Sequence, residues 1–267
     1  MPLGVCATPI GNLEDVTLRV LRELGEADVV LCEDTRRTRI LLERHGIDAR
    51  LVSYHEHNEA ERTAQMLPRL VAGERIALTS DAGLPGVSDP GARLISAALE
   101  AGVQVTVLPG ASAVETALVA SGLLGERFQF VGYLPRGGKA RAALWEELAR
   151  WPHPVVAFES PRRLPASLAL LAEAMPERPV AVCRELTKRF EEVIRGTAAE
   201  VAAQITEPPK GEITLVLGEL EPASGDEGDA LAAVADLVHA GAGRKQAADV
   251  VSRLTGRSRN ELYRASL

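Results

Sequence analysis

Short apolar runs alternate with helical patterns along nearly the whole chain, and few folds can accommodate this alternation. The runs are rich in Val, Ile and Leu, as in Val29–Glu33 and Ile76–Ser80. Runs of this kind are typical of strands that are covered on both faces, and the amphipathic stretches between them supply the covering helices. The sequence therefore predicts an α/β fold.

Two series of elements follow each other. In the first, we expect strands at Leu3–Ala7, Val29–Glu33, Arg50–Tyr54, Ile76–Ser80 and Val103–Leu108. The helices expected between them are Asp15–Leu24, Arg37–His45, Asn58–Ala72 with a kink at Pro68, and Ala92–Ala101. In the second, a helix at Ser112–Ser121 precedes strands at Phe128–Tyr133, Val155–Glu159, Val180–Arg184, Val193–Gly196 and Ile213–Leu217. The third and fourth of these strands are too close for a crossover helix, so we expect them to pair antiparallel in a mixed sheet.

The length of 267 residues suits two domains and an appendage. We expect an N-terminal α/β domain over residues 1–110 and a C-terminal α/β domain with a mixed sheet over residues 111–220. An acidic stretch with Gly, Pro and Ser predicts a linker over residues 221–229.

A small basic helical extension is expected over residues 230–267. From Gly241 onward, six basic residues stand against two acidic ones. A break at Gly256 and a capping box at Ser258 and Glu261 give this segment the outline of a helix-turn-helix. Such a helix pair can contact nucleic acid, but it also fits a packing cap or a dimer element.

Composition excludes several classes of protein. Apolar residues make up 46% of the chain and charged residues 25%, which excludes a disordered or collagen-like chain. The net charge of −7 would repel bulk nucleic acid, so an RNA partner requires a local basic patch. Three separated cysteines in apolar runs indicate buried thiols rather than a metal site. With neither a signal peptide nor a long apolar span, we expect a cytoplasmic protein without membrane contact or a bound metal.

Ligand chemistry is expected in the loops that follow strands, because ligands of open α/β sheets bind beyond the carboxyl ends of the strands. The loop Ser80–Gly91 contains three Gly and two Pro residues and exceeds the usual length of such a connection. Asp81 and Asp89 can accept hydrogen bonds from a ligand, although Asp89 also fits the N-cap of the next helix. The loop after the first strand fits either a cofactor loop or a plain turn capped by Asp15. Dinucleotide-binding and P-loop fingerprints are absent from the sequence, which disfavours NAD and nucleoside triphosphates.

Basic residues recur at the strand ends of the second half. They are Arg136, Lys139, Arg162, Arg163, Arg184, Lys188 and Arg189. Together they would form a local positive face able to meet a phosphate backbone. Alternatively, they are surface charges that pair with Glu159, Glu185 and Glu191.

Seven motifs, in this order, resemble the tetrapyrrole methylase superfamily. They are Thr8-Pro-Ile-Gly-Asn-Leu13, Glu33-Asp-Thr-Arg36, Ser80-Asp-Ala-Gly83 with Ser88-Asp-Pro-Gly91, Pro109-Gly-Ala-Ser112, Glu159-Ser-Pro161, Arg184-Glu-Leu186 and Lys210-Gly-Glu212. Within the superfamily, the series is similar to the branch that methylates a cytidine ribose 2′-hydroxyl in 16S rRNA. The terminal segment from Lys245 to Tyr263 is similar to the extension of that branch.

The resemblance implies two α/β domains of the class III methyltransferase type, a homodimer, S-adenosylmethionine as cofactor, and 16S rRNA within the 30S subunit as partner. Carried over by position, the cofactor-binding residues are Pro9, Gly11, Asp81, Gly83, Leu84, Ser88, Ala111, Ser112, Ala113, Phe158 and Gly211.

A ribose hydroxyl is weakly acidic, so its methylation requires a proton acceptor and is helped by a cation that stabilises the oxyanion. Among the residues that qualify by type, we favour Glu33, Arg36, Glu185 and Lys210 as catalytic. Two other functions stay open: a methyltransferase of this fold that acts on a tetrapyrrole or a protein side chain, and a non-catalytic RNA-binding assembly factor.

Overall fold

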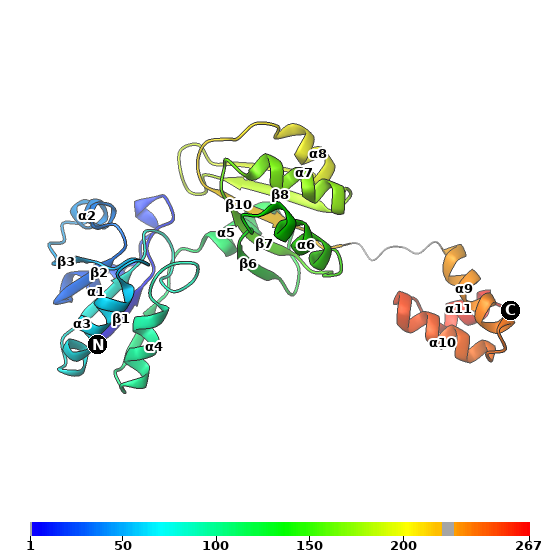
Figure 1. Cartoon of the computed structure of the whole chain (residues 1–267), viewed down its shortest axis with the longest axis horizontal. Coiled ribbons are helices and arrows are strands. Elements are labelled where there is room, and N and C mark those ends of the chain that lie inside the picture. The colour runs from blue at the N-terminus through cyan, green and yellow to red at the C-terminus, as the bar shows by residue number, and fades with distance from the viewer. Residues whose placement is uncertain (1, 221–226) are drawn as a thin grey trace. The chain divides into compact units, whose positions relative to one another are not determined.

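A computed structural model of the chain describes residues 2–220 and 227–267, and side chains in the second range from residue 230 onward (Figure 1). It contains two compact units, Met1–Glu219 and Leu220–Leu267. The linker expected at residues 221–229 lies largely outside the described residues, and its last three residues belong to a helix that begins at Glu227.

The first sheet of the larger unit is entirely parallel. Its strands are β1 (Leu3–Cys6), β2 (Val29–Cys32), β3 (Leu51–Ser53), β4 (Ile76–Thr79) and β5 (Val105–Leu108), in the order β3-β2-β4-β1-β5. The expected strands of the first series are therefore confirmed, each shortened by one or two residues. The carboxyl ends of all five strands lie at one edge, so the loops that follow them gather there.

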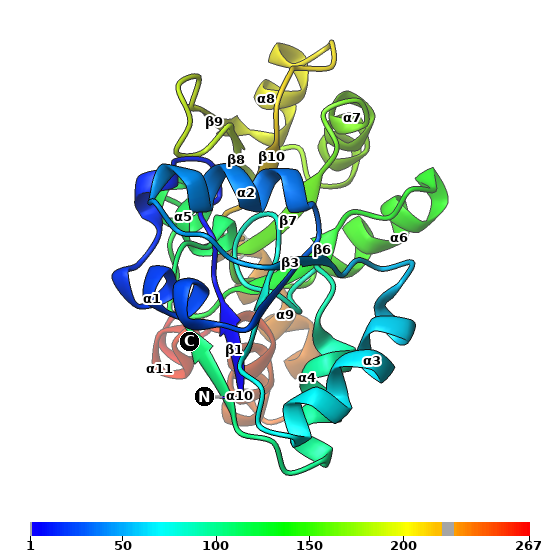
Figure 2. The same ribbon diagram turned by 90° about the vertical axis from the view of Figure 1, so that its left-hand side faces the viewer.

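Four helices cover this sheet, as Figures 1 and 2 show: α1 (Leu18–Glu26), α2 (Thr35–Arg44), α3 (Glu59–Val71) and α4 (Ala92–Glu100). Successive strand residues point to opposite faces. Leu3 and Val5 therefore pack in one cluster with residues of α3 and α4. Cys6 packs in the other cluster, with residues of α1 and α2. Because both faces of the sheet are covered by helices, its strands consist of nearly continuous runs of apolar residues.

The first turns of these helices differ from expectation. Asn12 caps a short 3-10 helix, η1 (Leu13–Asp15), and Thr17 caps α1, so Asp15 is not the capping residue. Helix α4 begins after Gly91, and no side chain caps it. The N-cap expected at Asp89 is therefore wrong, because the chain makes a further turn at Pro90 and Gly91 before the helix begins.

The second sheet is mixed. Its strands are β6 (Gln129–Tyr133), β7 (Val155–Glu159), β8 (Pro179–Arg184), β9 (Glu192–Thr197) and β10 (Ile213–Leu217), in the order β6-β7-β10-β8-β9. Only β6 and β7 pair parallel among the described strands of this sheet. Strands β8 and β9 pair antiparallel over six residues each, which confirms the expectation from their short separation.

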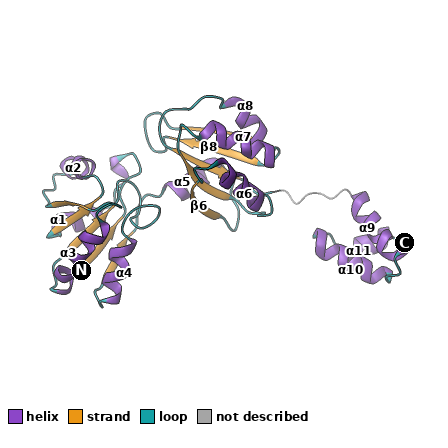
Figure 3. Ribbon diagram, in the orientation of Figure 1, coloured by secondary structure: helices purple, strands orange, loops and turns teal. Residues whose placement is uncertain are grey.

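The second sheet also has helices on two faces (Figure 3). Helix α5 (Ala113–Ser121) packs on one face, against Val156, Ala181 and Val216. The alternate strand residues, such as Val182 and Leu215, are buried on the opposite face. Helix α7 (Leu164–Ala174) packs against both α6 (Gly138–Leu148) and α8 (Ala198–Gln204), and α8 contacts β8 and β9.

The smaller unit consists of α9 (Glu227–His239), α10 (Arg244–Thr255) and α11 (Arg259–Ala265). A small core of Ala230, Val234, Ala247, Ala248, Val251 and Leu262 holds the three helices together. Gly256 adopts a left-handed conformation with φ of 70° and ends α10, and Ser258 caps α11, as expected from the sequence. Among the described residues, no helix has the length and apolar character needed to span a bilayer.

Candidate active site

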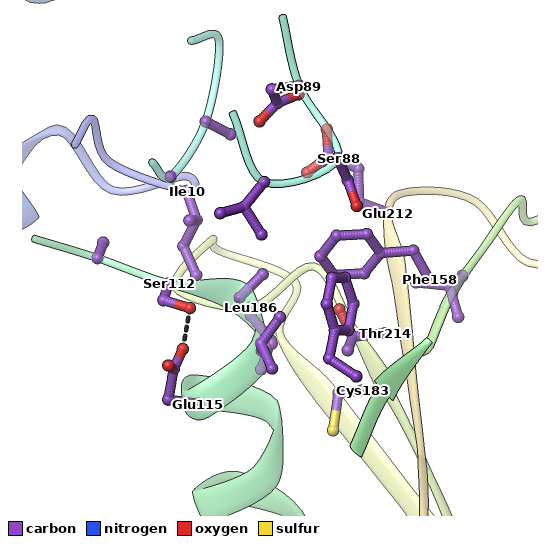
Figure 4. Close-up of a pocket in the computed structure, with 18 of the residues that line it drawn as sticks. Ile10, Ser88, Asp89, Ser112, Glu115, Phe158, Cys183, Leu186, Glu212 and Thr214 are labelled. Carbon is purple, nitrogen blue, oxygen red and sulfur yellow. Dashed lines mark hydrogen bonds between the residues drawn. The ribbon is translucent and has the colours of Figure 1, made fainter. Parts of the chain in front are cut away.

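A cavity of about 740 Å³ lies within the larger unit, between loops that follow strands of the first sheet and residues of the second (Figure 4). The first part of the chain contributes Ile10, Ala82, Gly83, Leu84, Val87, Ser88, Asp89 and the segment from Pro109 to Glu115. The remaining lining residues are Phe128, Phe130, Tyr133, Phe158, Glu159, Ser160, Pro161, Cys183, Leu186 and the segment from Gly211 to Thr214. The size and the largely apolar walls are typical of a small-molecule site.

The loop after β1 is fixed on both sides. Thr8 and Gly83 exchange two backbone hydrogen bonds of 2.8 and 3.0 Å, which ties this loop to the loop after β4. On the other side, the N–H of Asn12 donates to Oγ1 of Thr187 at 3.0 Å. A Cβ at Gly11 would approach Oγ1 of Thr187 to 2.8 Å, so glycine is required there by close approach. The two sheets are thus joined beside the cavity.

The loop after β4 contains left-handed backbone at Gly83, Gly86, Ser88 and Gly91. Ser88, with φ of 60°, is the only non-glycine among them. A non-glycine residue in this region is uncommon and is found preferentially at functional sites. The turn at Ser88 brings two adjacent side chains, Ser88 and Asp89, to the wall of the cavity (Figure 4).

Three acidic side chains influence one another at the strand ends of the first sheet. Burial and the neighbouring Asp81 carboxylate raise the pKa of Glu33. Burial, with the carboxylates of Glu33 and Asp81, raises the pKa of Asp89 to about 7. Asp34 differs, because hydrogen bonds from Arg36 lower its pKa to about 2. The cavity therefore has a negative edge on this side.

The carboxylate of Asp81 interacts with other groups of the protein. It accepts a hydrogen bond of 2.9 Å from the N–H of Asp34 and lies 3.4 Å from Arg37. These contacts hold the loop after β2 against the loop after β4.

Three aromatic rings form one wall of the cavity. The ring of Phe158 lies edge-to-face with Phe130 at 5.0 Å and with Tyr133 at 5.4 Å. Phe130 and Tyr133 both reach Phe158 because the register of β6 shifts between them. Tyr133 is 63% exposed, which leaves its ring free to contact a larger ligand.

A buried carboxylate in the lining, Glu159, organises the loop after β7. Glu159 lies 2.5 Å from Arg163, accepts a hydrogen bond of 2.6 Å from the N–H of Ser160 and contacts the hydroxyl of Ser167. Arg141, also buried, lies 3.9 Å from it. Because the charge of Glu159 is compensated, the group is structural at this position.

Glu185 has a similar structural environment. Its carboxylate accepts hydrogen bonds of 2.9 Å from the N–H of Glu212 and of 2.9 Å from Lys188, and these contacts lower its pKa. Lys188 also pairs with Glu212 at 2.8 Å. Gly211, with φ of 99°, lies so close to Glu185 that a Cβ there would overlap its side chain.

The cavity contains most of the cofactor residues expected from the sequence. Gly83, Leu84, Ser88, Ala111, Ser112, Ala113, Phe158 and Gly211 line it, whereas Pro9, Gly11 and Asp81 lie outside its lining. None of the expected catalytic residues, Glu33, Arg36, Glu185 and Lys210, lines it. Arg36 and Lys210 are exposed.

Sequence reasoning gave no cavity role to Phe130 or Tyr133, and it took Asp89 for either a ligand acceptor or a helix cap. The length of the loop Ser80–Gly91 was the available signal for Asp89. The shift of register in β6, which brings Phe130 and Tyr133 to the cavity, has no comparable signal in the sequence.

The positive face expected on the second half is smaller than the sequence implies. Arg163, Arg184 and Lys188 are engaged with Glu159, Glu192 and Glu185, respectively. Arg136, Lys139, Arg162 and Arg189 form no ion pair with any residue that the structure describes. Those four remain available to an anionic partner.

Comparisons with known proteins agree with this architecture. Residues 3–202 match the family model of the tetrapyrrole (corrin/porphyrin) methylases. The chain is 43% identical over 268 residues to ribosomal RNA small subunit methyltransferase I of Mesorhizobium japonicum, covering 99% of this chain and 91% of the relative. It is 45% identical over 265 residues to the protein of that name from Micromonospora olivasterospora, covering 98% and 85%.

Among solved structures, the uroporphyrin-III C-methyl transferase of Thermus thermophilus complexed with S-adenyl homocysteine has a TM-score of 0.58 at 22% identity, covering 81% of this chain and 97% of that one. This likeness supports the fold. The family match and the two sequence relatives show that the chain belongs to the tetrapyrrole methylase family and, within it, to the group of ribosomal RNA small subunit methyltransferase I.

Proposed function

We propose that the chain is an S-adenosylmethionine-dependent methyltransferase that acts on ribosomal RNA of the small subunit, at the ribose 2′-hydroxyl of a cytidine in 16S rRNA. Family membership and relatives at over 40% identity support rRNA methylation. The cavity between the two sheets is the observation that carries the proposal, because most of the residues expected to hold the cofactor meet there.

The cavity suits the chemistry of S-adenosylmethionine. The cofactor carries an adenine ring, a sulfonium and an ammonium group, and when bound it supplies an activated methyl group. Phe130, Phe158 and Leu84 offer an apolar surface to a ring. Carboxylates in the lining favour the positive charges of the ligand. Ala111, Ser112 and Ala113 are small, so their backbone can approach a ligand closely.

In such a reaction the residues of the chain hold the methyl donor, contact the RNA and align the hydroxyl with the methyl group. The loop Gly83–Ser88 and the segment Ala111–Ala113 hold the donor from the first sheet, and Phe158 and Gly211 hold it from the second. The exposed ring of Tyr133 is placed to stack on a base of the RNA. Alignment of a hydroxyl with the methyl group, together with removal of water, accounts for much of the rate enhancement.

The wider setting follows from the same proposal. We propose a homodimer that recognises 16S rRNA within the 30S subunit in the cytoplasm, with the helices α10 and α11 contributing to RNA contact. Six basic residues from Arg244 to Arg264, five in these helices and Arg257 in the turn between them, support this role in a chain with a net charge of −7. We also keep Asp81, Pro9 and Gly11 as proposed supports of the cofactor loops rather than direct contacts.

Incubation of the protein with methyl-labelled S-adenosylmethionine and 30S particles from cells that lack the modification tests the proposed function. We expect label in 16S rRNA, and we expect an excess of S-adenosylhomocysteine to suppress it. Label in a ribosomal protein, or label in uroporphyrinogen but not in rRNA, would contradict the rRNA substrate. Binding of 30S particles without any consumption of the cofactor would contradict catalysis and favour an assembly factor.

A further inference from the structure

Four carboxylates line the cavity, and only one of them has no partner among the residues that the structure describes. Glu115 contacts the hydroxyl of Ser112, Glu159 is held by Arg163, and Glu212 pairs with Lys188. Asp89 has neither a hydrogen bond nor an ion pair within residues 2–220 and 230–267. It is half-buried, and Figure 4 shows it beside Ser88 on the loop after β4.

The fold gives Asp89 no structural task. The helix that follows it begins at Ala92, after Gly91, so the carboxylate of Asp89 does not cap α4. The N–H of Gly91 donates instead to Glu59 at 3.0 Å. A half-buried charge without a partner is costly, and such groups persist where function requires them.

The groups that face Asp89 oppose its ionisation. Glu33, after β2, and Asp81, after β4, are both acidic; Arg37 pairs with Asp81, and Arg37 and His55 offset part of the effect of burial and of Asp81 on Glu33. Tyr133, on β6, approaches from the other sheet, and the negative charge of Asp89 contributes to the raised pKa of its phenol. A carboxyl group with a pKa of about 7 is a far better proton acceptor at neutral pH than an ordinary aspartate.

The other acidic candidates are less suitable. Glu185 is held by Lys188 and the N–H of Glu212, which lower its pKa and occupy its oxygens. Glu33 has a raised pKa but does not line the cavity. We propose that Asp89 is the proton acceptor of the methyl transfer, an inference that rests on the function proposed above.

The step balances without a further reactant. The ribose oxygen forms a bond to the methyl carbon while the bond from sulfur to that carbon breaks, and the electron pair stays on sulfur. The proton of the hydroxyl passes to a carboxylate oxygen of Asp89. The products are the methyl ether, S-adenosylhomocysteine and a neutral carboxylic acid, which later loses its proton to water.

Single-turnover rates on unmodified 30S particles between pH 5.5 and 9 test this role. At pH 8, Asp89→Asn should lower the rate by roughly 100-fold or more, the usual contribution of a general base. The wild-type rate should rise about tenfold per pH unit below pH 7 and then level off, and the variant should lose this dependence. Asp89→Glu should restore part of the rate. Asp48→Asn, at an exposed aspartate outside the cavity, is the matched control.

Two further readouts separate a chemical role from a binding or structural one. Calorimetry should find the affinity of Asp89→Asn for S-adenosylmethionine within about threefold of wild type, because asparagine keeps the shape of the side chain. In the cofactor-free protein, the ¹³C carboxyl signal that Asp89→Asn removes should titrate near pH 7.

Three results would overturn the assignment while the wild type remains active on rRNA: a variant rate within threefold of wild type, an unchanged pH profile in the variant, or a titration midpoint below pH 5. Failure of the wild type to methylate rRNA would instead remove the proposed function, and the role of Asp89 with it.

Discussion

Gly211 lies against Glu185, and the pair shows how single residues shape the cavity. Gly211 has φ of 99°, a conformation that side chains rarely adopt, and a Cβ there would overlap a glutamate that Lys188 and Glu212 hold in place. The glycine of the Lys210-Gly211-Glu212 motif is therefore explained by sterics, in addition to the motif's resemblance to known methylases. Asp89 shows the opposite case, because a half-buried carboxylate without a partner lowers the stability of the fold.

Gly211→Ala should lower the free energy of unfolding by about 1–3 kcal/mol, because the new methyl group meets both a left-handed backbone and a fixed side chain. Urea denaturation measures this change. Gly138→Ala is the control, since Gly138 begins α6 and has open space around it. Equal stability of the two variants would contradict the close packing at Gly211.

The pKa of Asp89 also has a consequence for stability. It is about 7 in the folded protein and about 3.9 in an unfolded chain. Between these values the folded state binds more protons, so this residue makes the free energy of unfolding fall as pH rises from 4 to 7. Asp89→Asn should therefore leave stability nearly unchanged at pH 4 and raise it by about 1–2 kcal/mol at pH 8, after allowance for partial exposure. A variant that is less stable than wild type at pH 8 would contradict the account.

At the scale of elements, the site depends on two loops from different sheets that touch at Asn12 and Thr187. Thr187, with φ of 65°, adopts an uncommon conformation for a β-branched residue. The loop after β1 also contributes Ile10 to the wall of the cavity. Loosening this contact should therefore affect the ligand site without unfolding either sheet.

Thr187→Ala removes the acceptor of the Asn12 N–H and should weaken the binding of S-adenosylmethionine by about 2- to 10-fold, the usual effect of losing one hydrogen bond. Thr187→Ser keeps the hydroxyl and should bind as wild type does. Calorimetry at one temperature compares the three proteins. The account fails here if serine and alanine behave alike.

The sequence predicted the elements better than the connections. Buried strands such as β4 and β10 were visible because both faces are covered, which leaves a continuous apolar run. The start of α1 was misplaced because Asp15 has the residue type of a cap, whereas Thr17 caps the helix. The start of α4 at Ala92 was confirmed, but the cap expected at Asp89 was wrong. Local residue type does not determine which turn the loop makes.

Only those parts of the candidate site that belong to recognisable loops and motifs could be predicted from the sequence. The small residues Gly83, Ala111 and Ser112 were expected at the cofactor and do line the cavity. Which carboxylate is left without a partner depends on ion pairs between distant residues, such as Lys188 with Glu212, and no local pattern reveals these. The aromatic wall likewise depends on a change of register in β6.

At the scale of the whole molecule, the three helices α9, α10 and α11 form a compact unit with its own core. This core includes Val234 of α9, so a truncation within the unit would leave α9 without its partners. The boundary at Glu219 is therefore the appropriate place to separate cofactor binding from the proposed RNA contact.

Truncation after Glu219 should leave the affinity for S-adenosylmethionine within about twofold of the full chain, because every residue that lines the cavity precedes this point. Methylation of 30S particles should fall by about 10-fold or more, and the loss should shrink at low salt, where the remaining basic residues act over longer distances. Filter binding and labelled methyl transfer at two salt concentrations measure both effects. A truncated protein with the full rate at physiological salt would show that the terminal unit has no part in RNA recognition.

The position of the methyl group in the product tests the central claim most directly. After reaction with unmodified 30S particles, 16S rRNA is digested to nucleosides and fragments, and mass spectrometry locates the added mass. We predict a single cytidine methylated on its ribose 2′-oxygen. A methyl group on a base, on a protein or at many scattered nucleotides would contradict it.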